Sequence, residues 1–440
     1  RSLYGGYRAY PTVLWGRNLD ALPHQGDSIN NNRLTVGVRS RLLTAFFYRD
    51  FRMLWLSDSF VGWAEQVEFV VLAWYVLQET DSPLMLGIYG ALRFTGTLFS
   101  PLFGVLVDRY DRRKLLVLTR SVFFANSGVL LVLAASDGLS VQHVFVLAGI
   151  AGMGRAFDTI VRQTVIADIV PASGLMNGVA LTRTGHDIMQ IVGPITGGYI
   201  LSAWGISVSY ISVIGLYAVG VAFAFNLKSL MAVGSASGPS LVANIREALG
   251  YVRRQEVILA LLLMAFLVNL TGFPLNQGLL PVFARDVLGL GATGLGQLLG
   301  AYAAGSMLGS ITLAAVPVIH RPGRMIVLGA LGWHGVMLLI AFSQWFGPSL
   351  ALLALTGMSQ SVAMVTMSMA ILSATSPEVR GRVMGLRSLA VYGLPIGLLL
   401  SGALADVFSV KIALIVNAAG GIVFAVGITV FLSELWRHHR

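Results

Sequence analysis

Runs of about twenty apolar residues recur along almost the whole chain after Phe51, and this repetition constrains the fold more than any other feature. A helix needs about twenty such residues to cross the ~30 Å hydrocarbon layer of a bilayer. Within lipid, every backbone N–H and C=O must be paired inside a helix or a closed barrel, and the alternating pattern of barrel strands is missing. We therefore predict an all-α integral membrane protein with twelve transmembrane helices, at residues 53–78, 83–107, 115–135, 142–164, 178–203, 207–227, 257–283, 294–317, 325–343, 348–373, 384–405 and 410–434.

The composition excludes a soluble fold independently. Hydrophobic residues make up 56% of the 440 positions and charged residues only 11%, whereas an average soluble domain has roughly 25% charged residues. A chain with so few charges cannot hide its apolar surface in one soluble core. The sequence has no Cys, which excludes disulfides and thiolate metal sites.

Basic residues gather on one side of the predicted helices, which is the pattern of cytoplasmic loops. The opposite loops carry only two basic residues, Arg285 and Lys411. We therefore expect both termini to be cytoplasmic. The net charge of +10 then reflects topology, and no soluble face interleaves basic and aromatic residues as a nucleic-acid interface does. The basic side holds Arg109, Arg112, Arg113, Lys114, Lys228, Arg246, Arg253, Arg254, Arg321, Arg324, Arg380, Arg382 and Arg387, with Arg437 and Arg440 in the tail.

The sequence lacks the motifs of enzymes and of ATP-driven pumps. Residues 289–294 match the letters of a dinucleotide-binding fingerprint, but they lie in a predicted outer loop with no preceding strand. There is no nucleotide-phosphate loop, no His pair at metal-ligand spacing and no nucleophile elbow. We expect no enzymatic activity, no cofactor and no metal site, and an ion gradient as the driving force.

The chain divides near residue 240 into two sets of six predicted helices. We expect residues 1–50 to be a polar, disordered N-terminal extension, and residues 435–440 to be a cytoplasmic tail. The two six-helix bundles then cover residues 51–227 and 257–434. The linker, residues 228–256, begins with small residues and continues as an amphipathic helix from Pro239 to Arg254, which we expect to lie on the inner membrane surface.

A dense charge cluster, GVLVDRYDRRK at residues 104–114, separates the second and third apolar runs. Its spacing resembles the signature loop of the major facilitator superfamily, and the likeness covers residues 51–434. The resemblance implies two six-helix bundles that alternate access to a central site. It also implies that Asp108 and Arg112 join a charge network closing the inner side, and that Gly104 lets the second helix pack closely. The motif residues are Gly104, Asp108, Arg109, Arg112 and Arg113.

This loop departs from the family pattern at Asp111, a position that is often Gly. The extra acid either neutralises Arg113 or weakens the turn. Between the eighth and ninth helices, HRPGR at residues 320–324 repeats DRYDR at residues 108–112 in degenerate form. This echo has lost its acid, so we expect any latch formed there to be weaker.

A second motif, GPITGG at residues 193–198, resembles the antiporter motif of the same superfamily, which implies export in exchange for protons. Its physical content is a bend at Pro194 and a small-residue face at Gly193 and Gly197, followed by Gly198. The family usually has Gly where this chain has Met189. Residues 51–56, 90–93 and 377–382 resemble bacterial macrolide-efflux and enterobactin-exporter-like carriers, which implies a monomeric, multi-pass protein of the bacterial inner membrane.

Charges inside the spans are the candidate sites of chemistry, because an unpaired ion at mid-bilayer costs about 3 kcal/mol or more. At ~100° per residue, Asp58, Glu65 and Glu68 share one stripe of the first helix. Arg93 of the second helix lies at the same predicted depth as Glu68, about 15 Å below the outer face at 1.5 Å per residue, so we expect the two to pair. Either Glu68 or Glu65 exchanges a proton while Arg93 competes for the carboxylate, or the pair is a static link between helices.

Two further pairs of charges are close in sequence. Arg155 with Asp158, and Arg183 with Asp187, are spaced to neutralise each other within one helix. Alternatively, Arg155 faces an anionic ligand or the acids of the first helix.

Two other polar residues of the first half have more than one explanation. His186 adjoins Asp187 and belongs to a residue type that titrates near neutral pH, so it is either a proton relay or a hydrogen-bonded packing residue. Arg120 either reaches the inner surface or pairs with Asp58.

The second half has no Asp or Glu in its predicted helices before Asp406, so we expect proton chemistry only in the first half. Neutral amides and Met side chains occur there instead, a combination that suits a broad amphipathic ligand, although Met also packs in ordinary bundles. The candidate substrate-binding residues are Arg93, Arg155, Asn269, Asn276, Gln277 and Gln360.

These observations predict a proton-coupled exporter of amphipathic small molecules or drugs that works by alternating access. One alternative is a dedicated siderophore or metabolite exporter in which Arg93 and Arg155 bind anionic groups. Another is a non-transporting membrane receptor or scaffold, in which replacing Glu65 and Glu68 changes stability but no flux.

Overall fold

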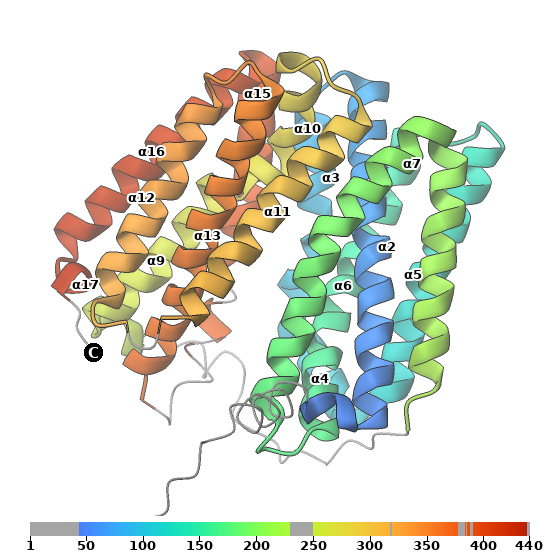
Figure 1. Cartoon of the computed structure of the whole chain (residues 1–440), viewed down its shortest axis with the longest axis horizontal. Helices are drawn as coiled ribbons and strands as arrows, with labels where there is room; N and C mark the ends of the chain where they lie inside the picture. Colours follow the sequence, from blue (N-terminus) through green and yellow to red (C-terminus); the bar gives the residue numbers. More distant parts are fainter. Residues whose placement is uncertain are drawn as a thin grey trace, which may run out of the picture. The chain divides into compact units, whose positions relative to one another are not determined.

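The computed structural model describes residues 44–228, 250–316, 319–376, 383, 385–387 and 390–437. All secondary structure in these ranges is helical (Figure 1). Eight of the helices are long and apolar enough to cross a membrane, and the bent pair Pro83–Phe99 with Leu102–Arg109 makes a ninth if it is one span. The all-helical membrane fold is confirmed, whereas the count of twelve spans and the side on which the termini lie stay predictions.

The first set of helices is built around α2 (Arg49–Thr80), which packs against α7 (Leu175–Phe225) along much of its length. Side-chain caps begin two of its neighbours. The Ser82 hydroxyl accepts a bond from the backbone N–H of Met85 (3.3 Å), and Asp111 accepts bonds from the N–H groups of Arg113 and Lys114. The other elements are η1 (Thr44–Phe47), α3 (Pro83–Leu92), η2 (Thr95–Phe99), α4 (Ser100–Arg109), α5 (Arg112–Ala135) and α6 (Val141–Ile169).

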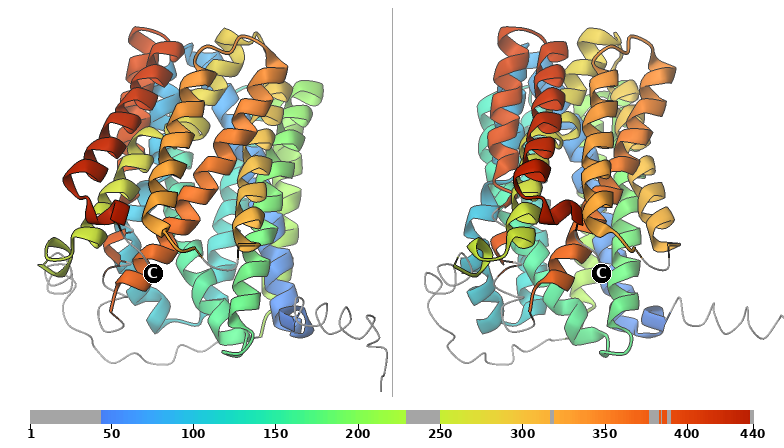
Figure 2. Two further views of the ribbon diagram at one scale, coloured as in Figure 1. Left: turned by 60° about the vertical axis from the view of Figure 1, so that its left-hand side comes forward. Right: turned by 90° about the vertical axis from the view of Figure 1, so that its left-hand side faces the viewer.

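In the second set, α11 (Ala292–Ala314) packs on α13 (Phe346–Ala374), and α12 (Pro322–Ile340) lies between α13 and α16 (Val410–Phe431), as Figures 1 and 2 show. The remaining elements are α9 (Glu256–Thr271), η3 (Leu275–Leu279), α10 (Leu280–Val282), η4 (Phe283–Val287), α15 (Gly393–Val407) and α17 (Glu434–Arg437).

The predicted span at 83–107 is wrong as a single straight helix. Its α-helix breaks after Leu92, and the segments Pro83–Phe99 and Leu102–Arg109 are bent by 57°. The hydroxyls of Thr95 and Thr97 donate to the carbonyls of Leu92 and Phe94 at the break, bonds that compete with helical ones.

The fifth and sixth predicted spans, 178–203 and 207–227, both fall on the helical segment α7, and a kink at Gly205 separates them as expected. The φ of Gly205 is 77°, a value that is open to glycine and strained for other residues. The seventh span, expected at 257–283, reaches Val287 because two π-helical segments, η3 and η4, continue α9.

The predicted domain boundaries stay predictions, because Leu43–Arg440 form one compact unit. Within the described residues, helical structure is already present at Thr44–Phe47, before the expected start at residue 51. Most of the predicted amphipathic helix lies outside the described residues, as do residues 1–43, Arg380, Arg382 and Arg440.

Close glycine contacts join the two sets of helices at the end that we predict to be outer. A Cβ placed on Gly87 of α3 would lie 2.6 Å from the carbonyl oxygen of Leu398 on α15. A Cβ on Gly296 of α11 would likewise overlap the carbonyl of Pro194 on α7. Such backbone contact between helices needs small residues, so these glycines hold the two sets together at this end.

Candidate functional site

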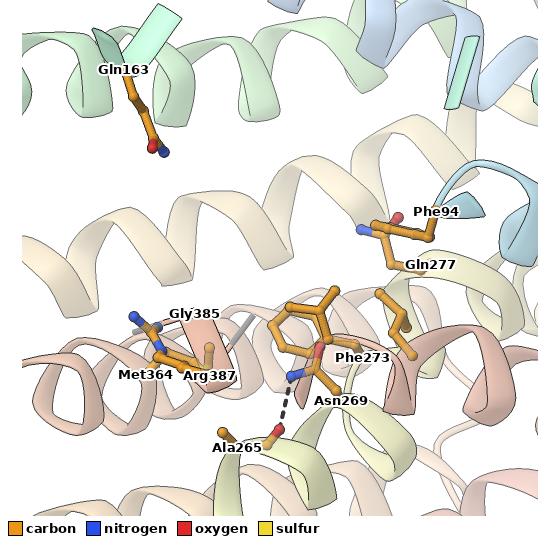
Figure 3. Close-up of a pocket in the computed structure, with 11 residues that line it drawn as sticks. Phe94, Gln163, Ala265, Asn269, Phe273, Gln277, Met364, Gly385 and Arg387 are labelled. Atoms are coloured by element: carbon orange, nitrogen blue, oxygen red, sulfur yellow. Dashed lines mark hydrogen bonds between the residues drawn. The ribbon is translucent and has the colours of Figure 1, made fainter. Parts of the chain in front are cut away.

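A cavity of about 670 Å³ lies between elements of the two sets of helices. Figure 3 shows Gln163 of α6 on one side and Asn269 of α9, with Gln277 of η3, on the other. The π-helical segment places Gln277 at this cavity, and π-helical turns are frequent at functional sites. The described lining consists of Phe94, Gln163, Ala265, Asn269, Phe273, Gln277, Met364, Gly385, Arg387, Val391 and Leu394.

The cavity brings together some of the predicted ligand-binding amides but not all. Asn269 and Gln277 line it, and the Asn269 amide donates to the carbonyl of Ala265 (2.8 Å). Asn276 is buried with its Oδ1 lacking a hydrogen-bond partner. Gln360 instead accepts a bond from the Ser306 hydroxyl (3.1 Å) and links α13 to α11.

Sequence reasoning missed most of the other lining residues, among them Phe94, Gln163 and Arg387. Gln163 could have been predicted as a candidate ligand-binding residue, because it is an uncharged amide within a predicted span. Arg387 was assigned to a cytoplasmic position from its charge alone. Among the described lining residues, Arg387 is the one with a charged side chain.

The predicted pair between Glu68 and Arg93 is wrong. The Arg93 guanidinium lies over the Phe69 ring, 4.2 Å from its centroid, and donates to Oε1 of Gln277 (3.3 Å). Its Nε is buried without a hydrogen-bond partner, and no described acid forms an ion pair with it. Contact with Phe69 puts Arg93 at the expected depth, but on a different side of α2 from Glu68. The depth of a residue in the membrane follows from the helical rise per residue. The neighbour that its side chain faces depends on how each helix is rotated about its axis.

Glu68 and Glu65 share Arg155 of α6. Arg155 Nη2 lies 3.2 Å from Glu68 Oε2, and Arg155 Nε lies 3.4 Å from Glu65 Oε1. Glu68 also accepts bonds from the hydroxyls of Ser127 (3.2 Å) and Tyr217 (3.3 Å). The side chain of Glu68 is 3% exposed and that of Glu65 21%. We call Glu65, Glu68 and Arg155 the upper cluster. In it, two carboxylates contact one guanidinium directly.

Asp58 and Asp158 share Arg120 in the same way. Arg120 is fully buried; its Nη2 pairs with Asp58 and its Nε lies 3.3 Å from Oδ1 of Asp158. The expected pairing of Arg120 with Asp58 is confirmed, and Arg120 does not reach the inner surface. The expected pair between Arg155 and Asp158 is wrong, because each has its partner on another helix.

Helix α7 carries the remaining predicted charges. Arg183 pairs with Asp187 one turn later (3.0 Å), as expected, and the His186 ring contacts the Gln190 amide (2.7 Å).

The antiporter motif packs the same helix against two others. A Cβ at Gly197 would lie 2.9 Å from the Val67 Cα, and one at Gly193 would overlap the Gln66 side chain, both on α2. A Cβ at Gly198 would overlap the Ala292 carbonyl on α11. The predicted small-residue face is therefore present, and it serves both sets of helices.

The signature loop is held by contacts that differ from those expected. Arg112 pairs with Asp168 at the end of α6 rather than with Asp108, which is exposed, as is Arg109. Asp111 caps α5 instead of weakening the turn, and Arg113 donates to the carbonyl of Phe225 (2.5 Å).

The expected close packing at Gly104 is wrong. A Cβ there would meet nothing within 4 Å. Gly104 lies in the segment Leu102–Arg109, which is bent by 57° from Pro83–Phe99, so a straight span does not predict its neighbours.

Charged contacts join the two sets of helices at the predicted outer end. Arg285 of η4 lies 2.8 Å from Asp81 and donates to the carbonyl of Leu77 (3.0 Å). Asp406 of α15 accepts a bond from the Ser82 hydroxyl (2.6 Å). Sequence analysis placed these charges in outer loops but paired none of them. Together with the glycine contacts, they hold the two sets of helices together at this end.

Replacing Arg285 with glutamine is expected to raise access to the cavity from the predicted outer side up to about fivefold, because an exposed ion pair contributes roughly 0.2–1 kcal/mol. The chain has no native Cys, so a single Cys at position 269 reports access through its rate of labelling by a membrane-impermeant reagent. The control is Arg49→Gln, which removes an arginine paired with Asp50 within the first set. An unchanged labelling rate in Arg285→Gln would exclude a closing role.

Comparison with known proteins shows which family the chain matches and which proteins it is similar to. The pattern of a family described as transmembrane secretion effector matches residues 42–438. Macrolide efflux protein A of Streptococcus pyogenes is 24% identical over 367 residues, which cover 80% of this chain and 90% of that protein. Enterobactin exporter EntS of Escherichia coli is 25% identical over 371 residues, 81% and 84% of the two chains. A solved POT family transporter in complex with 5-aminolevulinic acid has a TM-score of 0.73 at 11% identity, over 88% of this chain and 97% of that one.

Proposed function

This chain belongs to the transmembrane secretion effector family of major facilitator transporters, and we propose that it is a proton-coupled exporter of amphipathic small molecules. It is a multi-pass membrane transporter and not an enzyme. The proposed cycle alternates access to the cavity between the two sets of helices in a bacterial inner membrane, with the protein as a monomer. Macrolide efflux and enterobactin export are named for its relatives, and they support an amphipathic substrate and an outward direction.

The upper cluster is the observation that carries proton coupling. Two carboxylates in direct contact with one guanidinium leave one excess negative charge unless one carboxyl group holds a proton. Because an uncompensated charge inside the membrane is costly, the cluster favours binding one proton when it is closed from water. Arg93 and Arg162 act on Glu65 electrostatically, but neither forms an ion pair with it.

Of the two acids that the sequence left open, Glu65 is the better candidate for the exchanging one. Glu68 is held by Arg155, Ser127 and Tyr217 together, whereas the ion-pair partner of Glu65 among the described residues is Arg155 alone, at 3.4 Å. The greater exposure of Glu65 gives a proton easier passage to it. Moving one charge through the membrane field supplies ~2.3 kcal/mol per 100 mV, enough to drive a useful substrate gradient.

Accumulation of a fluorescent cationic dye in efflux-deficient cells tests this proposal. We expect cells expressing the protein to hold less dye than empty cells, and a protonophore to remove the difference. Unchanged dye levels would exclude broad export of cations and leave the second candidate. Export that persists with the protonophore would exclude proton coupling.

The second candidate is a dedicated exporter of anionic siderophores or metabolites. The observation that favours it is the charge of the cavity: Arg387 lines it, Arg93 binds Gln277 at its edge, and its described lining has no carboxylate. Arg155, the other arginine proposed for anions, is occupied by two acids. The receptor or scaffold alternative loses its support, because the family consists of transporters.

Replacing Arg93 with glutamine separates the two candidates. If the substrate is anionic, we expect its transport efficiency to fall about tenfold or more, because a hydrogen bond to a charged group contributes about 1.5–3 kcal/mol. Uptake of an iron-free catecholate or carboxylate siderophore into inside-out vesicles measures this loss, with Arg49→Gln as control. Equal transport by Arg93→Gln and the unmodified protein would exclude Arg93 as an anion-binding residue.

A further inference from the structure

A second hollow lies on the second set of helices, away from the central cavity. It is a groove of about 500 Å³ whose described lining comes from α12, from Arg321 just before it and from α13, and we call it the α12–α13 groove. Two of its side chains are largely exposed, Leu328 at 59% and Leu355 at 47%. In a membrane protein, apolar side chains exposed this far face lipid tails. Its described lining is Arg321, Arg324, Met325, Leu328, Gly329, Leu355, Met358, Ser359 and Val362.

The groove has a charged end and an apolar body. Arg321 precedes α12 and Arg324 lies in its first turn, at the end that we predict to be cytoplasmic. Farther along the groove, a Cβ placed on Gly329 would lie 3.1 Å from Ala363, so α12 and α13 are in close contact there. The exposed apolar side chains thus line the body of the groove, and the two arginines lie at its predicted cytoplasmic end.

Neither arginine has an acidic partner among the residues that the structure describes. The Arg324 guanidinium instead lies 5.2 Å from the centroid of the Trp436 ring on α17, which packs against α12. The Nε of Arg324 is buried and has no hydrogen-bond partner. A half-buried guanidinium that has an unused donor and no described acidic partner is suited to bind an anion.

At the matching position of the first half, the arginine has an acidic partner, although its Nε is likewise buried without a hydrogen-bond partner. Aligning DRYDR with its echo HRPGR places Arg324 opposite Arg112 and His320 opposite Asp108. Arg112 is neutralised by Asp168. The echo keeps two arginines, and no described acid takes the place of Asp168 for Arg324.

We propose that the α12–α13 groove binds one anionic phospholipid. Its phosphate accepts hydrogen bonds from Arg321 and Arg324 and supplies the missing negative charge, and one acyl chain lies along Leu328, Leu355 and Met358. Basic pockets between transmembrane helices on the cytoplasmic side suit such headgroups, and a tryptophan at the same level suits the interface. A free phosphate would satisfy the arginines but leave the apolar body of the groove uncovered.

Native mass spectrometry of the full-length protein tests this site with phosphatidylglycerol and phosphatidylcholine of identical acyl chains. We expect one phosphatidylglycerol to bind roughly 30-fold more tightly than phosphatidylcholine, because each basic residue contributes about fivefold toward an anionic lipid. The double variant Arg321→Gln with Arg324→Gln should lose this preference. The matched control, Arg253→Gln with Arg254→Gln, removes two exposed arginines outside the groove and should keep it.

Two outcomes would overturn the proposal. The first is an unchanged preference for phosphatidylglycerol in the double variant. The second is equal thermal stabilisation by inorganic phosphate and by phosphatidylglycerol, which would assign the arginines to a free anion.

A variant that keeps both arginines covers the case in which the double variant does not fold. Leu355→Trp fills the apolar part of the groove at an exposed position, so we expect it to fold and to bind the lipid at least several-fold less tightly. Undiminished lipid binding in this variant would also contradict the proposal.

Discussion

Replacing Glu65 with glutamine is expected to abolish the uphill export of substrate while the protein stays folded and still exchanges substrate downhill. The amide mimics the protonated acid, so the upper cluster no longer takes up and releases a proton. At 100 mV, a carrier that loses one exchanged charge loses ~2.3 kcal/mol, which corresponds to a roughly 50-fold smaller substrate gradient. Substrate accumulation in inside-out vesicles, energised by an acidic lumen, measures the loss.

We expect Glu68→Gln to abolish uphill export as well. In that variant the cluster keeps one carboxylate and one guanidinium, whose charges cancel, so it has no need to bind a proton. The double variant Glu65→Gln with Glu68→Gln should instead fail to fold, because Arg155 then lacks a counter-ion inside the membrane. Glu79→Gln, an exposed acid near the end of α2, is the control and should export normally. If both single variants export against the gradient as the unmodified protein does, the cluster is a static ion pair.

Replacing Arg120 with methionine is expected to cause the largest loss of stability, about 3–5 kcal/mol. Arg120 is fully buried within the protein. Its removal leaves Asp58 and Asp158 buried without their shared counter-ion. The Ser57 hydroxyl also loses its bond to Arg120. Fluorescence-detected gel filtration after heating in detergent should show a markedly lower melting temperature.

A rescue experiment distinguishes charge from packing at this site. Adding Asp58→Asn and Asp158→Asn to Arg120→Met removes all three charges, and we expect most of the stability to return, because a fully uncharged site avoids the desolvation cost. Arg183→Met is the control, since it breaks a pair whose arginine is 61% exposed and should cost about 0.3–0.5 kcal/mol. If the triple variant is as unstable as the single one, the loss arises from packing.

The candidate site was only partly predictable from the sequence. The buried charges were identifiable one by one, because a charge within an apolar run stands out. Apart from Asp58 with Arg120, their partners on other helices were not, since Arg155 and Arg120 each bind two acids from other helices. The one pair predicted correctly within a helix, Arg183 with Asp187, depends only on local geometry.

The sequence by itself determined that the chain is a helical membrane protein, because the cost of unpaired backbone groups in lipid depends on local composition and length. It also determined the depth of Arg93, since the rise per residue is constant. Only the tertiary structure decided that Arg93 contacts Gln277 and that Glu68 pairs with Arg155. Rotation of a helix about its axis, the break after Leu92 and the choice of neighbours come from packing among distant segments, and no local pattern records them.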